Sequence, residues 1–82
     1  MDRVHRLEQE TADKIARLHL KHQKEWDDIS KESEIALSNA RTVKEIKRIN
    51  KEYKERMEFL RVRQKNELLE LQKDFTRNLL QF

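Results

Sequence analysis

Apolar residues recur along the first half of the chain at steps of 3, 4 and 4, a pattern that repeats every eleven residues. This spacing keeps one face of a nearly straight α-helix apolar, so it predicts an amphipathic helix over about residues 3–38. The positions of this first stripe are Val4, Leu7, Thr11, Ile15, Leu18, His22, Trp26, Ile29, Ser33, Leu37 and Ala40.

A second stripe with the same steps begins 42 residues after the first and predicts a second amphipathic helix over about residues 43–80. Few residues outside the two stripes are identical at this shift. We therefore interpret the match as two helices that follow the same packing pattern, and not as an ancestral duplication. The positions of the second stripe are Ile46, Ile49, Tyr53, Met57, Leu60, Gln64, Leu68, Leu71, Phe75, Leu79 and Phe82.

The chain is expected to turn back on itself between the two stripes. In one continuous helix, a shift of 42 residues would rotate the second stripe about 120° away from the first, so no single partner would cover both. Asn39 is able to end a helix in the left-handed conformation, and Thr42 followed by Glu45 forms a capping box for a new helix. Asp2 is placed to cap the first helix. We therefore predict an all-α, antiparallel two-helix hairpin with a turn at about 39–42, as a single domain over residues 1–82.

Charges give an independent indication of the pairing. With a turn near Ala40, facing residues have numbers that sum to roughly 82, and an acidic stretch of the first helix meets a basic stretch of the second. The expected pairs are Glu34 with Arg48, Glu32 with Lys51, Asp28 with Lys54, Lys24 with Glu58, and Lys14 with Glu67. Exposed pairs stabilise little but set register. In this register Trp26 is expected to be buried against Tyr53 and Met57.

The composition excludes several classes of protein. The 82 residues include no Gly, Pro or Cys, and 43% are charged. There is thus no disulfide framework, no thiolate zinc site, no cysteine nucleophile and no phosphate-binding glycine loop. The longest apolar run covers only residues 35–37, too short for a membrane span, and no signal peptide precedes it, so we expect a cytoplasmic protein.

No catalytic or cofactor site is expected. A two-helix hairpin offers no concave pocket for a small-molecule substrate, so the chain is not expected to be an enzyme. Among the three histidines, His19 and His22 lie one turn apart, with Glu25 a turn further on, and three ligands at this spacing bind zinc in some proteins. His22 lies on the apolar stripe, where a polar layer that fixes register is the commoner explanation, so we assign no metal.

Apolar residues away from the two stripes suggest an interaction surface. Two helices bury little, and a chain of this size needs very good packing, self-association or a partner to be stable. The candidate protein-interface residues are Leu20 and Ile35 on the first helix, and Phe59, Val62, Leu69 and Leu80 on the second. They are expected to support a helical bundle, most simply a dimer, or to dock a partner protein.

Basic residues suggest a second interaction surface. The net charge is +3, and residues 41–82 hold 12 basic and 7 acidic groups. One flank of the second helix carries Lys47, Lys51, Lys54, Arg61 and Lys65, a row able to follow a phosphate backbone. The alternative, which we favour, is that these residues pair with the first helix.

Three functions remain open. The first is a protein-binding module that acts as an inhibitor or adaptor, a type frequent among phage- and plasmid-encoded accessory proteins. The second is a nucleic-acid-binding hairpin dimer, and the third is a coiled-coil subunit of a larger assembly. The expected architecture is similar to that of Rop-like plasmid RNA regulators, but the apolar spacing here is eleven residues and the helices are longer, so no binding residue is carried over.

Overall fold

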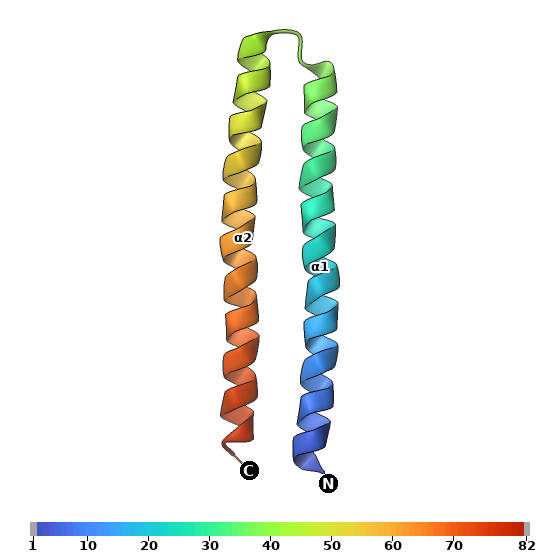
Figure 1. The fold of residues 1–82 in the computed structure, drawn as a ribbon, viewed down its shortest axis with the longest axis vertical. Helices are drawn as coiled ribbons and strands as arrows, with labels where there is room; N and C mark the ends of the chain where they lie inside the picture. Colours follow the sequence, from blue (N-terminus) through green and yellow to red (C-terminus); the bar gives the residue numbers. More distant parts are fainter. Residues whose placement is uncertain (1, 82) are drawn as a thin grey trace.

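The computed structural model describes residues 2–81 and consists of two antiparallel α-helices. Helix α1 spans Arg3–Asn39 and helix α2 spans Val43–Leu79, each with 37 residues. The helices lie side by side, the connection is at one end, and both ends of the chain lie at the other (Figure 1). The hairpin is long and thin, with principal extents of 63 × 16 × 7 Å. The all-α, antiparallel hairpin expected from the sequence is confirmed, and the helix ends lie within one residue of the expected ones.

The capping box at the start of α2 forms as expected, with one variation. The Glu45 backbone N–H donates to Thr42 Oγ1 at 3.1 Å. The Glu45 carboxylate accepts from the backbone N–H of Arg41 at 3.0 Å, one residue before the Thr42 N–H that the standard motif uses. Two amide groups at the turn thereby gain partners, which fixes where α2 begins.

The two other expected helix ends differ from the prediction. Asp2 stands at the N-cap of α1, but its side chain makes no cap hydrogen bond. Asn39 is the last residue of α1, and no residue in the described part of the chain has a φ in the left-handed region. The helix ends instead at Ala40, which is extended and whose N–H donates to the Leu37 carbonyl at 3.2 Å. A three-residue connection through extended backbone therefore replaces the expected left-handed turn.

The inner faces of the helices are the predicted stripes. Among the described residues, the buried ones are His22, Ile49, Leu60 and Gln64, and all four are stripe positions. Most other stripe residues are half-buried, and Trp26, Met57 and Tyr53 belong to this group, so Trp26 is less buried than expected. Phe82, the last position of the second stripe, lies outside the described residues. A two-helix interface is open to water along both edges, which explains why so few side chains are fully covered.

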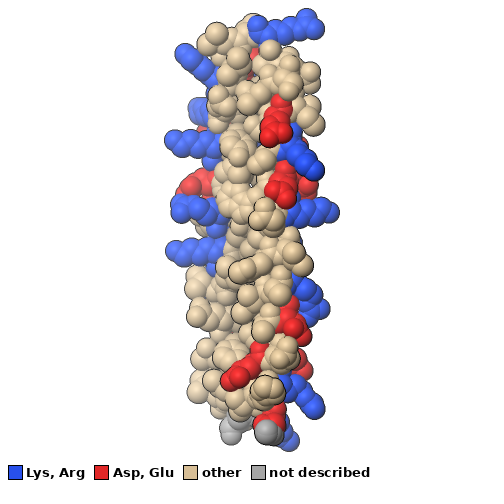
Figure 2. All heavy atoms as spheres, turned by 45° about the vertical axis from the view of Figure 1, so that its right-hand side comes forward, with Lys and Arg blue, Asp and Glu red and all other residues tan. Residues whose placement is uncertain are grey.

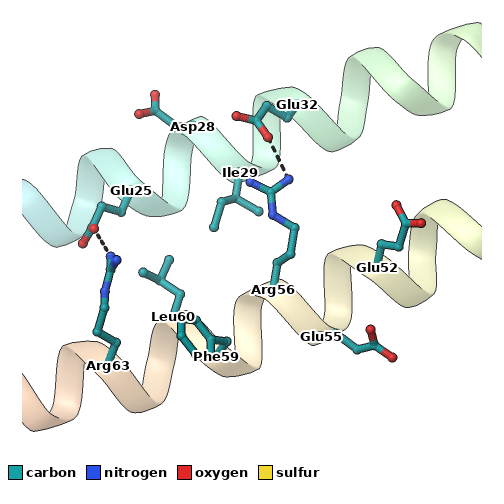
Figure 3. Close-up of a pocket in the computed structure, with 10 residues that line it drawn as sticks. All are labelled: Glu25, Asp28, Ile29, Glu32, Glu52, Glu55, Arg56, Phe59, Leu60 and Arg63. Carbon is teal, nitrogen blue, oxygen red and sulfur yellow. Dashed lines mark hydrogen bonds and ion pairs between the residues drawn. The ribbon is translucent and has the colours of Figure 1, made fainter.

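The ion pairs between the helices differ from the expected set. Glu32 pairs with Arg56 at 2.7 Å rather than with Lys51, and Glu67 pairs with Lys21 at 3.0 Å rather than with Lys14. Each partner on α2 lies about five or six residues further from the turn than a simple mirror register places it. Figure 3 shows the Glu32–Arg56 pair and a Glu25–Arg63 pair, both spanning the gap between the helices.

Side-chain direction explains this offset. In an α-helix, side chains lean toward the N-terminus, so those of α1 lean away from the turn and those of α2 lean toward it. Two long side chains meet only when the α1 residue is nearer the turn than the α2 residue. An offset of about six residues corresponds to about 9 Å along the helix axis, within reach of an arginine and a glutamate together.

None of the helices within residues 2–81 has an apolar stretch long enough to cross a membrane.

Candidate functional site

The outer face of α2 carries an exposed apolar patch, which we call the α2 outer patch: Phe59, Val62, Leu69 and Leu80. Phe59 is 72% exposed and Leu80 is 81% exposed, while Val62 and Leu69 are also exposed. Leu60 reaches toward Ile29 between the helices, whereas the adjacent Phe59 ring stays beside α2 (Figure 3). The patch is therefore apolar surface that the hairpin itself does not use.

Part of this patch borders a shallow depression on α2 alone. Phe59 and Val62 form its apolar part, and Lys51, Lys54, Glu55 and Glu58 line the rest of it. Apolar side chains bordered by charged ones are typical of a protein-contact site, because the apolar part loses water on binding while the charged border stays hydrated.

The two candidate apolar residues of α1 are exposed but isolated. Leu20 and Ile35 lie fifteen positions apart, which corresponds to roughly 22 Å along the helix. Both lie on the side of α1 that faces away from α2, so they point away from the α2 outer patch. The structure thus does not join Leu20 and Ile35 to the α2 outer patch, in which Phe59 and Val62 lie together in one depression.

The basic row of α2 is exposed and largely without acidic partners. Of its five residues, Arg61 pairs with Glu58 on the same helix at 2.6 Å, a contact that lowers the pKa of Glu58 and raises that of Arg61. Within the described part of the chain, the remaining members make no ion pair; these are Lys47, Lys51, Lys54 and Lys65. Lys and Arg side chains project from both edges of the molecule in the half nearer the turn (Figure 2).

This result reverses the interpretation that the sequence favoured. The expected pairs Glu32–Lys51 and Asp28–Lys54 do not form, since Glu32 is occupied by Arg56. The lean of the side chains shifts the acidic residues of α1 onto the other flank of α2. The basic row therefore stays available to an external anion.

A polar layer interrupts the apolar interface near its middle. His22 is only 7% exposed, and its backbone carbonyl accepts a hydrogen bond from Gln64 Nε2 at 3.3 Å. Gln64 Nε2 also lies 3.4 Å from Glu25 Oε1, and His22 Nε2 lies 3.6 Å from Glu67 Oε1. Lys21 and Arg63 complete the layer by pairing with Glu67 and Glu25.

The layer is electrostatically balanced. The Lys21 ammonium holds the pKa of Glu67 below its usual value, mainly through their hydrogen bond, with smaller contributions from His22 and Arg63. Two carboxylates thus lie between two cations across the interface. A polar layer with this many directed contacts fits in one register only, as the position of His22 on the stripe suggested.

Sequence reasoning recognised His22 but missed its partners. Gln64 occupies the position in the second stripe that corresponds to His22 in the first, and this coincidence of two polar residues was the available signal. His19, considered beside His22, is exposed and lies outside the layer, while Glu67 joins it from α2.

Comparison with known proteins adds no relative: no family model, no curated protein and no solved structure shows significant similarity to this chain.

Proposed function

We propose that this protein is a non-enzymatic protein-binding module, of the inhibitor or adaptor type, that presents the α2 outer patch to a partner. The main support for this proposal is that the hairpin buries few of its own apolar side chains. Of the apolar residues that the structure describes, only Ile49 and Leu60 are buried, whereas the outer patch exposes four large apolar side chains.

The surface area supports the same conclusion. The accessible surface of the chain is 6967 Å². A compact monomeric protein of 10.1 kDa exposes roughly 5,300 Å² on the general scaling of surface with mass. The hairpin thus exposes about 1,700 Å² more than a self-sufficient domain of its size. A standard protein interface buries about 800 Å² on each partner, so this excess is large enough to supply one or two interfaces.

The expected mode of binding is helix against helix. Val62, Leu69 and Leu80 lie on the face of α2 opposite its buried stripe, so a partner helix laid along this face contacts all three. A second copy of the hairpin used in this way yields a four-helix bundle, and a different protein yields a regulated complex. We place this function in a cytoplasm, as the sequence indicates.

The test compares two sets of substitutions in capture from lysate of the native source, followed by measurement of affinity for the purified partner. Phe59→Gln, Val62→Gln and Leu69→Gln together are expected to abolish the complex while the helical signal of the free hairpin is retained. The matched control changes the two lysines of the basic row that do not line the depression: Lys47→Gln and Lys65→Gln. Light scattering of the pure chain tells self-association from binding of another protein. Undiminished binding and assembly in the patch variant would contradict the proposal.

A second candidate function is binding of nucleic acid through the basic row of α2. It is favoured by the finding that four lysines of this row make no close ion pair in the described structure. Such binding is expected to weaken steeply with salt, because each neutralised phosphate releases counterions. Fluorescence anisotropy with labelled duplex RNA and DNA at 50 and 200 mM salt measures it. Lys→Gln changes at all four lysines should abolish this binding, and the patch substitutions should leave it intact.

A further inference from the structure

Three metal-binding groups converge in the polar layer between the helices. The ligand atoms of His22, Glu25 and Glu67 all lie within 4.8 Å of one another. His22 and Glu25 are one turn apart on α1, and Glu67 comes from α2. The three groups therefore meet only because the hairpin folds, and any ion held by all three would join the two helices.

Two atoms of this group are buried without hydrogen-bond partners. His22 Nε2 and Glu67 Oε1 are both inaccessible to water, and neither has a hydrogen bond. They face each other at 3.6 Å, which exceeds the 2.7–3.2 Å of an N–H···O hydrogen bond. Buried polar atoms without partners are costly, so this pair favours a positive species between them.

The distance between His22 Nε2 and Glu67 Oε1 suits two ligands of one metal ion. Zinc binds histidine nitrogen and carboxylate oxygen at about 2.0–2.2 Å in tetrahedral geometry, which sets neighbouring ligand atoms about 3.3 Å apart. The His22 Nε2 to Glu67 Oε1 distance of 3.6 Å is close to this edge. His22 is more than nine-tenths buried, so its ring is held in place rather than sampling solvent.

The neighbouring cations hold the outer oxygens of both carboxylates. Lys21 binds Oε2 of Glu67, and Arg63 binds Oε2 of Glu25. Oε1 of Glu67 faces His22 Nε2 at 3.6 Å, and Oε1 of Glu25 accepts a hydrogen bond from Gln64 Nε2 at 3.4 Å. Hydrogen-bonded carboxylates of this kind surround known metal sites, where outer partners orient the ligands.

From this geometry we propose that His22, Glu25 and Glu67 bind one divalent transition-metal ion of the zinc class, with water as the fourth ligand. One imidazole nitrogen and two carboxylate oxygens suit Zn²⁺ or Co²⁺, whereas Mg²⁺ and Ca²⁺ prefer oxygen ligands alone. Arg63 Nε lies 3.6 Å from Glu67 Oε1, while the guanidinium of the same residue holds Glu25 Oε2.

The charge of the layer sets the expected strength of binding. Lys21 and Arg63 already neutralise the two carboxylates, so an incoming dication gains less than at a purely acidic site. We expect a dissociation constant in the micromolar range. Because the unfolded chain does not hold the three ligands together, binding stabilises the hairpin. Zinc at about 100 times its dissociation constant lowers the unfolding equilibrium constant about 100-fold, with a rise in Tm on the order of 10 °C.

The experiment titrates the full chain with Zn²⁺ and with Co²⁺, using calorimetry for stoichiometry, visible absorption for Co²⁺ geometry and thermal melting for stability. The expected result is one ion per chain, a tetrahedral Co²⁺ spectrum and a raised Tm. His22→Gln and Glu67→Gln are expected to lose all three signals, whereas His19→Gln, which removes an exposed histidine one turn away, retains them.

A measurement on the unaltered chain covers the case in which the variants unfold. Zinc should shift the His22 ring nitrogen resonances in the NMR spectrum and leave those of His5 and His19 in place. Absence of binding at 1 mM metal would overturn the proposal. Equal loss of binding in His19→Gln, or shifts at all three histidines, would also overturn it, because both indicate adventitious surface binding.

Discussion

Two adjacent residues of α2, Leu60 and Phe59, are expected to contribute very differently to the stability of the hairpin. Leu60 is the most buried apolar side chain in the described structure, at 4% exposure, and it points toward Ile29 of α1 (Figure 3). Phe59 is the larger side chain, but most of it is in water. We therefore expect Leu60→Ala to destabilise the hairpin strongly and Phe59→Ala to leave the free monomer nearly unchanged.

The size of the Leu60 effect follows from its surroundings. Leu→Ala at a fully buried site costs about 2.7–5 kcal/mol, and the cost is lower where neighbours move in to fill the cavity. The two-helix interface is open at both edges, which eases such movement, so we expect about 2–3 kcal/mol. For a domain of this size, that corresponds to a fall in Tm on the order of 10 °C. Phe59→Ala should fall within about 0.5 kcal/mol of the unaltered chain, as exposed positions do.

The assay is urea unfolding followed by far-ultraviolet circular dichroism. It is run at chain concentrations low enough that the midpoint no longer depends on concentration, so that self-association through the α2 outer patch does not contribute. Equal destabilisation by Phe59→Ala and Leu60→Ala would refute the assignment of the inner and outer faces of α2. A Leu60→Ala effect below about 0.5 kcal/mol would show that this residue is not in a core.

Three further predictions concern the turn, the polar layer and the register. Thr42→Ala should cost about 1 kcal/mol in urea unfolding, as loss of an N-cap does, whereas Ser38→Ala should have little effect. The pKa of Glu67 is lower in the folded chain than in the unfolded chain. The ionised Glu67 carboxylate therefore stabilises the fold fully above its unfolded pKa of about 4.3, and this contribution disappears as the pH falls through its pKa in the folded chain. Melting curves from pH 7 to 2 should show this loss in the unaltered chain and a shallower slope in Glu67→Gln. A double-mutant cycle on Glu32 and Arg56 should give a coupling of about 0.2–1 kcal/mol, and a cycle on Glu32 and Lys51 should give none.

The periodic features of the sequence predict the fold well. All four buried residues fall on the two stripes, because burial follows from helix geometry that repeats along the chain. The capping box is also local, since Thr42 and Glu45 need only each other and the adjacent backbone. Features that depend on one helix or one turn are therefore accessible from the sequence.

Contacts between the helices are harder to predict. The pairing of Glu32 with Lys51 was wrong because a mirror register ignores the lean of side chains, which moves the partner to Arg56. Trp26 is half-buried because one neighbouring helix does not surround an indole. Asn39 keeps a helical backbone because extended backbone at Ala40 ends the helix without any left-handed residue.

The polar layer shows the same limit at the candidate metal site. His22 and Glu25 are related by helical spacing and are visible in the sequence, but Glu67 joins them from α2. Glu67 lies beside His22 and Glu25 only if the register between the two helices is correct to within one turn. From the sequence, only His19 could be considered beside His22 and Glu25, and no metal was assigned, whereas the fold brings in Glu67, which is near in space.

The antiparallel hairpin is the central claim, and an intramolecular distance tests it most directly. The chain has no cysteine, so Gln9→Cys and Thr76→Cys introduce two unique sites for spin labels near the open end of the hairpin. Dilution with unlabelled chain removes distances between molecules. Helices packed 8–10 Å apart should give a label separation of roughly 10–25 Å by pulsed electron resonance. A single extended helix would separate these positions by about 100 Å, and the absence of a short intramolecular distance would contradict the hairpin.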